Sequence, residues 1–263
     1  MKILFFGDVV GRVGRSGVKQ AISKAKAEHQ PDIIIANAEN LAHGIGITPK
    51  IIEEMQSYGV NLFTSGNHVW DKPVGEEVLQ AKNPVVLRPA NYGNRKSGQG
   101  YKVVELGGQK LLVINLQCQV WMKDEVDSPF TTLDEILAQH DLKSLDAIFV
   151  DLHGEATSEK VAMGHYADGR VSALVGTHTH VPTADGRILP GGTAYQTDVG
   201  ITGARDSVIG VQKENILKRF LGEGGKRFEY AEEGACDINA VLIDVGPDRK
   251  ANSIRLLQWT VET

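Results

Sequence analysis

Short apolar runs alternate with amphipathic stretches along this chain, and the two periodicities predict alternating strands and helices. Apolar runs of four or five residues are typical of strands buried in the middle of a sheet. They occupy residues 2–6, 32–36, 61–64, 146–150 and 171–175. Between them, Val18, Ala21, Ile22 and Ala25 share one helical face. A further helix is predicted from the Thr48-Pro49 start to Gly59.

The middle and the end of the chain follow a different pattern. Two antiparallel hairpins are predicted there. The first joins residues 101–106 to 110–115 across Gly107-Gly108, and the second joins residues 237–245 to 252–260 across residues 246–248. Helices are predicted near residues 131–140 and 213–221. The fold class is therefore α/β with mixed sheets. A chain of this length favours a single domain, which we expect over residues 1–263.

Composition narrows the class of protein. Hydrophobic residues make up 41% and charged residues 23%, which is usual for a globular protein with a sizeable core. No apolar run is long enough for a membrane span, and the first residues lack the features of a signal peptide, so we expect a cytoplasmic protein. Cys118 and Cys236 have no metal-binding spacing. The net charge of −5 argues against bulk binding of nucleic acid, although a small anion held by metal remains allowed.

Each predicted strand of the parallel type ends in a polar cluster. Carboxyl ends of strands gather at one edge of an open α/β sheet, where ligand sites form. His178 and His180 follow the run at 171–175, and in an extended backbone residues two apart would point to the same face. The clusters are Gly7-Asp8, Glu39-Asn40, Gly66-Asn67-His68, His153-Gly154 and Gly176-Thr-His178-Thr-His180.

These side chains suit metal ions. Carboxylate, amide and imidazole donors without thiolates favour Mn, Fe, Co or Zn over Ca or an iron-sulfur cluster. They are too many for one tetrahedral ion, so two ions bridged by a shared carboxylate fit better. Glu39 is the natural bridge, because it stands between Asp8 and Asn67 in the series of clusters.

The ordered motifs resemble the calcineurin-like metallophosphoesterases, and most closely their YmdB-type bacterial branch. Asp8-Val-Val10 replaces the Asp-x-His of the broad superfamily, and Glu39 replaces its bridging Asp; both departures match the branch. The resemblance covers essentially the whole chain and implies a four-layer αββα sandwich of two mixed β-sheets flanked by helices. Its motifs are Gly7-Asp-Val-Val-Gly-Arg12, Asn37-Ala-Glu-Asn40, Gly66-Asn-His-Val-Trp-Asp71, Leu87-Arg-Pro-Ala-Asn91, Asp151-Leu-His-Gly-Glu-Ala-Thr-Ser-Glu159 and Gly176-Thr-His-Thr-His180.

The resemblance also implies roles for individual residues. It assigns one ion to Asp8, Glu39, Asn40 and His180, and the other to Glu39, Asn67, His153 and His178. Asn40 could equally hydrogen-bond behind the ligands. His68 is left free to act as a general acid or to stabilise charge. We expect Fe or Mn ahead of Zn or Co, and in-line attack on phosphorus by a metal-bridging hydroxide.

Hydrolysis of 2′,3′-cyclic nucleotides is the activity that the resemblance implies. The expected partner is therefore a small phosphodiester or cyclic nucleotide. We expect binding neither to a membrane nor to bulk nucleic acid. Assembly into a homo-oligomer is left open. The alternative is a regulatory or scaffold protein that binds metal and nucleotide with slow or incidental turnover. An unligated His68 favours the enzyme, since a pure binding module has no evident need for it.

Other residues have competing interpretations. The glycines at 7, 11 and 14 do not form the G-x-G-x-x-G pattern of dinucleotide-binding proteins. His43 could touch substrate or lie in solvent, and Arg88 could hold a phosphate or serve the fold. The tryptophans at 70, 121 and 259 could stack a base, although most tryptophans simply pack.

Overall fold

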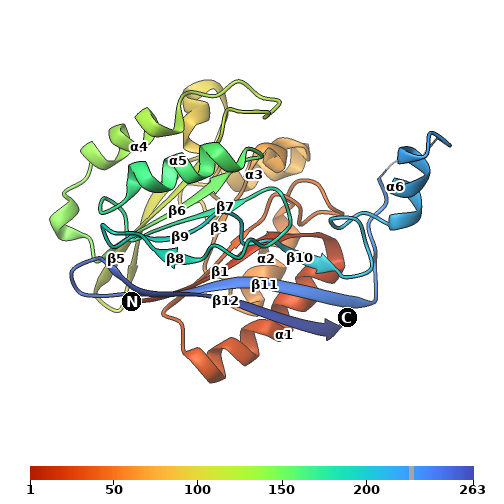
Figure 1. The fold of residues 1–263 in the computed structure, drawn as a ribbon, viewed down its shortest axis with the longest axis horizontal. Coiled ribbons are helices and arrows are strands. Elements are labelled where there is room, and N and C mark those ends of the chain that lie inside the picture. The colour runs from red at the N-terminus through yellow and green to blue at the C-terminus, as the bar shows by residue number, and fades with distance from the viewer. Residues whose placement is uncertain (225–227) are drawn as a thin grey trace.

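Two six-stranded β-sheets lie face to face in the computed structural model, which describes residues 1–224 and 228–263 (Figure 1). Sheet A is parallel at β1, β2, β3 and β10 and ends in the long antiparallel hairpin of β11 and β12. Its strands in spatial order are β12 (Ala251–Glu262), β11 (Ala235–Val245), β10 (Ile201–Ala204), β1 (Lys2–Val9), β2 (Ile33–Asn37) and β3 (Leu62–Thr64).

Sheet B is parallel in its centre and antiparallel at both edges. The hairpin predicted around Gly107-Gly108 forms one of these edges, because β4 pairs with β5 along their full common length. The strands in spatial order are β4 (Tyr101–Leu106), β5 (Gln109–Gln117), β6 (Ala147–His153), β7 (Ala173–Thr177), β9 (Ala194–Gln196) and β8 (Arg187–Ile188).

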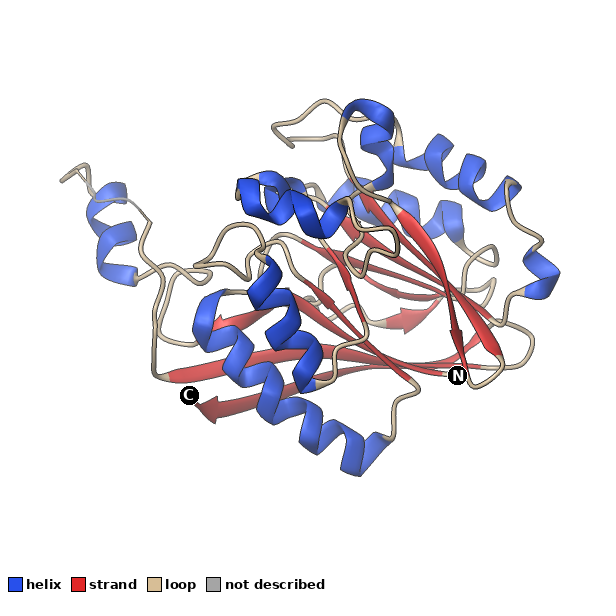
Figure 2. Ribbon diagram, turned by 180° about the vertical axis from the view of Figure 1, so that it is seen from behind, coloured by secondary structure: helices blue, strands red, loops and turns tan. Residues whose placement is uncertain are grey.

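Helices cover the outer face of each sheet (Figure 2). An apolar layer joins α1 and α2 to sheet A, and another joins α4 and α5 to sheet B. The α-helices are α1 (Gly11–His29), α2 (Pro49–Tyr58), α3 (Glu76–Leu79), α4 (Pro129–Ala138), α5 (Thr157–Ala167) and α6 (Lys213–Phe220). Short 3-10 helices are η1 (Asn67–Trp70), η2 (Pro73–Gly75), η3 (Ala90–Arg95) and η4 (Leu142–Ser144).

A third apolar layer lies between the two sheets. Phe5 of sheet A and Phe149 of sheet B meet there, with ring centroids 5.1 Å apart. The order of layers is therefore helices, sheet A, sheet B, helices, and the predicted four-layer αββα sandwich of mixed sheets is confirmed. One domain over residues 1–263 stays a prediction.

The strands that the hydrophobic pattern did not predict are short. β8, β9 and β10 span two to four residues each, and β9 and β10 contain Gln, Thr or Gly. Their pairing with β7, β1 and β11 makes them strands, and such long-range pairing leaves little trace in a local pattern. Because β10 and β9 continue the two sheets, they support the loop that carries His178 and His180.

One helix stands apart from this arrangement. α6 projects from the body of the molecule at the right of Figure 1, at the same end as the carboxyl ends of β1 and β10. Within the described residues, none of the helices combines the length and the apolar character that crossing a membrane requires.

Candidate metal centre

The predicted ligands lie at the carboxyl ends of strands from both sheets. Asp8 stands near the end of β1, and Glu39 and Asn40 occupy the turn that follows β2. Asn67 and His68 begin η1, directly after β3. His153 is the last residue of β6, and His178 and His180 follow β7. The two sheets thus contribute opposite halves of one group of side chains.

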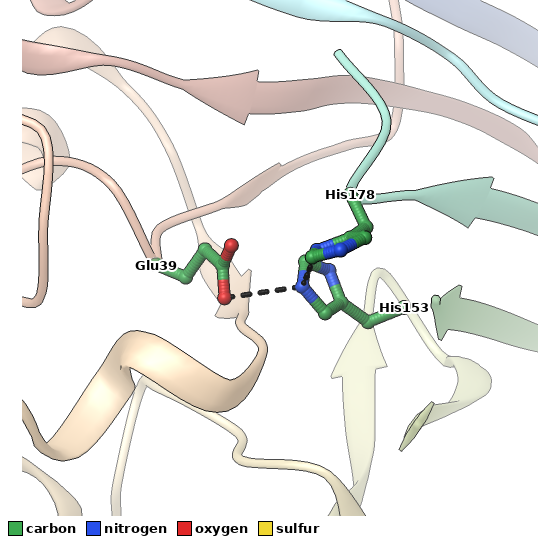
Figure 3. A group of neighbouring side chains, drawn as sticks. All are labelled: Glu39, His153 and His178. Atoms are coloured by element: carbon green, nitrogen blue, oxygen red, sulfur yellow. Dashed lines mark hydrogen bonds and ion pairs between the residues drawn. The ribbon is translucent and has the colours of Figure 1, made fainter. Parts of the chain in front are cut away.

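Glu39, His153 and His178 form a close cluster, which we call the His153 cluster (Figure 3). One potential ligand atom from each lies within 4.8 Å of the others. Glu39 Oε2 is 3.1 Å from His153 Nε2, and His178 Nδ1 is 3.0 Å from the same nitrogen. Glu39 comes from sheet A and both imidazoles from sheet B, so the cluster joins the sheets at a point that could hold a cation.

A second group lies beside it and is less closed; we call Asp8, Asn40 and His180 the His180 cluster. Asp8 Oδ2 accepts a hydrogen bond from the backbone N–H of His178 at 3.0 Å. Among the described residues, Asp8 Oδ1 and Asn40 Oδ1 are buried without a hydrogen-bond partner. Asn67 Oδ1 is in the same situation. Unsatisfied buried oxygens are uncommon, and each of these belongs to a predicted metal ligand.

The protonation equilibria reflect this crowding. Burial alone would raise the pKa of Glu39, but the charge and hydrogen bond of His153 outweigh it and lower that pKa to about 2. Burial disfavours the imidazolium of His153, yet Glu39 raises its pKa to about 9. Burial and the neighbouring His153 charge lower the pKa of His178 to about 3. Burial raises the pKa of Asp8.

The backbone at the two histidines differs from the sequence prediction. β7 ends at Thr177, and His178 and His180 have φ of 101° and 66°. The prediction of an extended backbone through these two histidines is therefore wrong. Both histidines nevertheless reach the cavity that Glu39 also lines, because the chain turns sharply there. Positive φ is uncommon for non-glycine residues, so surrounding contacts must hold this loop.

A buried ion pair supplies those contacts. Lys160 of α5 places its Nζ 2.7 Å from Asp198 Oδ2, and both side chains are buried. The same Lys160 Nζ donates to the carbonyl of Thr177, and Asp198 Oδ2 accepts from the backbone and hydroxyl of Thr179. The loop between β7 and His180 is thereby fixed from two sides.

A hydrogen-bonded chain orients His153. The Thr177 hydroxyl donates to Asp151 Oδ1 at 2.8 Å, so its oxygen is left to accept from His153 Nδ1 at 2.9 Å. Asp151 also accepts from Thr64 and Asn37. Burial raises the pKa of Asp151 to about 6 against these hydrogen bonds. The proton on Nδ1 directs Nε2 of His153 toward Glu39, as in metal sites where an outer partner sets the tautomer.

His68 is placed differently from the other histidines. Its Nδ1 lies 2.7 Å from Asp71 Oδ2, and its backbone N–H donates to Glu39 Oε2 at 3.3 Å. The ring lines the cavity, with Nε2 left available for a ligand. Gly66 allows this approach, because a Cβ there would overlap Glu39 Oε2 and His153 Nε2. His68 is thus close to the bridge residue but outside the His153 cluster.

The other candidates have structural surroundings. His43 is exposed and lies 3.5 Å from Glu232. The Arg88 guanidinium is occupied by the carbonyls of Pro89, Ala90 and Gly93, which favours the role in the fold over phosphate binding. Trp70 packs against Tyr92, Trp259 packs against the sheet A core, and Trp121 is exposed.

Some residues around the site escaped the sequence analysis. Asp71, Asp151 and Glu155 stand inside motifs that were quoted, but no role was given to them. Lys160 and Asp198 lie far from each other in sequence, and no local pattern signals their pairing. The segment around α6 was predicted as a helix without any connection to the site, although it lines the same cavity.

Two packed mixed sheets with carboxylates, amides and imidazoles at their carboxyl ends define the protein as a metallophosphoesterase. More narrowly, the chain belongs to the family of YmdB-like proteins, whose model matches residues 4–257. The predicted resemblance is thereby confirmed.

Relatives agree with this assignment. The chain is 46% identical over 252 residues to the 2′,3′-cyclic-nucleotide 2′-phosphodiesterase of Bacillus subtilis, covering 95% of this chain and 93% of the relative. A crystal structure of a hypothetical protein from Thermus thermophilus matches with a TM-score of 0.92 and 38% identity, over the whole of both chains. A novel phosphatase from Mycoplasma pneumoniae matches with a TM-score of 0.91 and 35% identity, over 100% of this chain and 94% of that one. The predicted class, a phosphodiesterase enzyme, is confirmed at the level of the family.

Proposed function

We propose that this protein is a dimetal phosphodiesterase that hydrolyses small phosphodiesters, with 2′,3′-cyclic nucleotides as its preferred substrates. The observation that carries the proposal is the His153 cluster in a cavity that His68 lines from outside the cluster. The name of the Bacillus relative supports the choice of substrate.

The donors suit two ions that share Glu39. Asn40 Nδ2 donates to the Gly44 carbonyl, which leaves its buried Oδ1 for a cation and favours a direct ligand role. Two such ions, Fe or Mn ahead of Zn or Co, would neutralise phosphate charge and lower the pKa of a bound water. One ion would be held by Asp8, Glu39, Asn40 and His180, and the other by Glu39, Asn67, His153 and His178.

His68 supplies the proton for the leaving group. The Nδ1–H of His68 can donate to Asp71 Oδ2, 2.7 Å away, and this hydrogen bond would orient the ring so that Nε2 can face the substrate. In hydrolysis of a cyclic diester, water adds to phosphorus and one ring P–O bond breaks. The departing ribose oxygen takes the proton from His68 Nε2, and the product is a nucleoside monophosphate. A positioned acid of this kind contributes about 10²- to 10⁴-fold to the rate.

The cavity favours a small substrate over a polymer. Its volume is about 780 Å³, within the range of pockets for small ligands. A long nucleic acid would require an extended basic groove, and the chain has a net charge of −5. Ring strain in a five-membered cyclic phosphate adds a driving force that monoesters lack.

The test is a steady-state comparison of kcat/KM on metal-loaded protein. The substrates are 2′,3′-cyclic AMP and GMP, 3′,5′-cyclic AMP, p-nitrophenyl phosphate and a long RNA. We expect the 2′,3′-cyclic nucleotides to be opened most efficiently, to a single monophosphate isomer. A preference for monoesters or RNA would overturn the proposal. Turnover no faster than that of His68→Ala would favour the regulatory or scaffold alternative.

A further inference from the structure

The segment that carries α6 is attached to the candidate metal centre at both ends. We define the α6 segment as residues 208–224 and 228–230. At its start, the Ile209 carbonyl lies 2.8 Å from His180 Nδ1. At its end, the Tyr230 ring packs so closely against Gly44 that a Cβ on residue 44 would overlap the ring. The carbonyl of Gly44 in turn accepts a hydrogen bond from Asn40 Nδ2. The segment therefore contacts the His180 cluster directly at its start, through His180, and indirectly at its end, through Gly44 and Asn40.

Backbone pairing closes the segment into a loop over the site. Val211 forms isolated β-bridges with both Val208 and Tyr230, and the backbone N–H of Gln212 donates to the Glu229 carbonyl at 2.9 Å. α6 stands on this base and projects outward (Figure 1). Its position relative to the centre is thus set by hydrogen bonds at its base.

Aromatic side chains of this segment line the cavity yet remain in contact with solvent. Phe220 is 84% exposed and Phe228 is 50% exposed, although both belong to the cavity wall. The Arg219 guanidinium lies over the Phe228 ring, 5.1 Å from its centroid. Large exposed apolar side chains grouped beside a polar site indicate a surface that a ligand covers.

The lining of the cavity thus combines two chemically different groups of side chains. It includes Glu39, His68 and His178 of the candidate metal centre, and Phe220 and Phe228 of the α6 segment. A phosphate belongs beside the first group, since its charge needs the cations and the imidazole. A flat aromatic group belongs beside the second, where phenyl faces and a planar guanidinium can stack on it.

We propose that Arg219, Phe220 and Phe228 form a subsite for the nucleobase of the substrate, in the same cavity that receives the scissile phosphate. This inference rests on the proposed function, because it requires a nucleotide as substrate. Stacking is tolerant of base identity, so purines and pyrimidines are both accepted, with purines bound more tightly through their larger face. The residues act in binding and make no contact with the reacting phosphorus.

The experiment compares two substrates with the same strained ring. One is 2′,3′-cyclic AMP, and the other is methyl β-D-ribofuranoside 2′,3′-cyclic phosphate, which lacks the base. For 2′,3′-cyclic AMP, Phe220→Ala and Phe228→Ala should each raise KM by about 5- to 150-fold, the range for loss of one base-stacking contact. Their kcat, and all constants for the base-free substrate, should stay as in the wild type. Phe220→Trp keeps an aromatic face and should retain the low KM.

Leu217→Ala is the matched control. Leu217 lies on the same helix and is 54% exposed, but it does not line the cavity, so its loss should change neither substrate. Equal wild-type KM for the two substrates would overturn the subsite and leave the phosphodiesterase function standing. Failure to cleave either substrate would overturn both. If Phe220→Ala and Leu217→Ala impair both substrates equally and break up an oligomer, α6 is a subunit contact instead.

Discussion

The His153 cluster and the His180 cluster hold the same kinds of side chain but in different states of assembly. In the first, Glu39 and His178 both contact His153 Nε2, at 3.1 and 3.0 Å. In the second, two buried oxygens have no partner among the described residues. A buried acceptor without a partner costs about 1–3 kcal/mol, a cost that a bound cation would remove.

The two clusters are held in position by different parts of the structure. Sheet B fixes His153 through Thr177 and Asp151, so the His153 cluster is positioned before any ion binds. In the His180 cluster only Asp8 belongs to a strand; Asn40 and His180 lie in loops, and His180 contacts the α6 segment. We therefore expect one ion to bind more tightly than the other, the tighter one at the His153 cluster.

The largest expected effect comes from Glu39→Ala, which would break both clusters together. Glu39 is the shared ligand in the proposal, so the variant should lose most of its two ions and at least about 10³-fold in activity. Elemental analysis after refilling with Mn measures the ions. As a matched comparison, Asp8→Ala should retain the ion of the His153 cluster. Wild-type protein that holds no more metal than the Glu39 variant would refute the site.

His68→Ala separates chemistry from metal binding. The side chain lies outside both clusters, so metal content and melting temperature should stay close to those of the wild type. Turnover of 2′,3′-cyclic AMP should fall by about 10²- to 10⁴-fold, as for other general acids. Metal content by elemental analysis and kcat are measured on one sample. Loss of metal would make His68 a ligand and reassign the site.

Thr177→Val tests the preassembly of the His153 cluster. Removing the hydroxyl leaves His153 Nδ1 without its acceptor, and outer-partner changes of this kind weaken metal binding by about 10- to 100-fold. Competition with a chelator measures the affinity. Thr193→Val is the control, since it removes a buried hydroxyl, just before β9, that donates to the Val171 carbonyl. Equal losses of affinity in both variants would show a general loss of stability, contrary to the positioning role.

The smallest expected effect comes from Glu155→Gln. Glu155 Oε2 lies 3.3 Å from His178 Nε2, but the carboxylate is half exposed and solvent screens the contact. We expect a change of about 5-fold or less in metal affinity by the same competition assay. A loss as large as that of Thr177→Val would identify Glu155 as a ligand and enlarge the His153 cluster.

Much of this arrangement could be predicted from local patterns. The short, continuous apolar runs that became β1, β2, β6 and β7 are easily recognised as buried strands. The polar residues at the ends of these strands were therefore correctly placed at one edge of the sheets. The sequence analysis missed features that depend on residues far away in the chain. β10 exists because β1 and β11 flank it, and Lys160 reaches Asp198 only after α5 packs on sheet B.

The histidine loop shows the same limit in one short stretch. His178 and His180 were correctly expected to turn toward the site, but for a wrong reason, because their positive φ angles replace the extended backbone. Asp198 and Lys160 hold that conformation from outside the motif. The spacing of the two histidines therefore predicts the location of their side chains more reliably than it predicts the backbone conformation.

The contact between Ile209 and His180 joins two binding equilibria. If the α6 segment closes on a base, the carbonyl that it carries restrains the imidazole, and an ion on that imidazole restrains the segment in return. Thermodynamic linkage requires the two effects to be equal in free energy. Nucleotide product should therefore strengthen the binding of the weaker ion by the same factor by which that ion strengthens nucleotide binding.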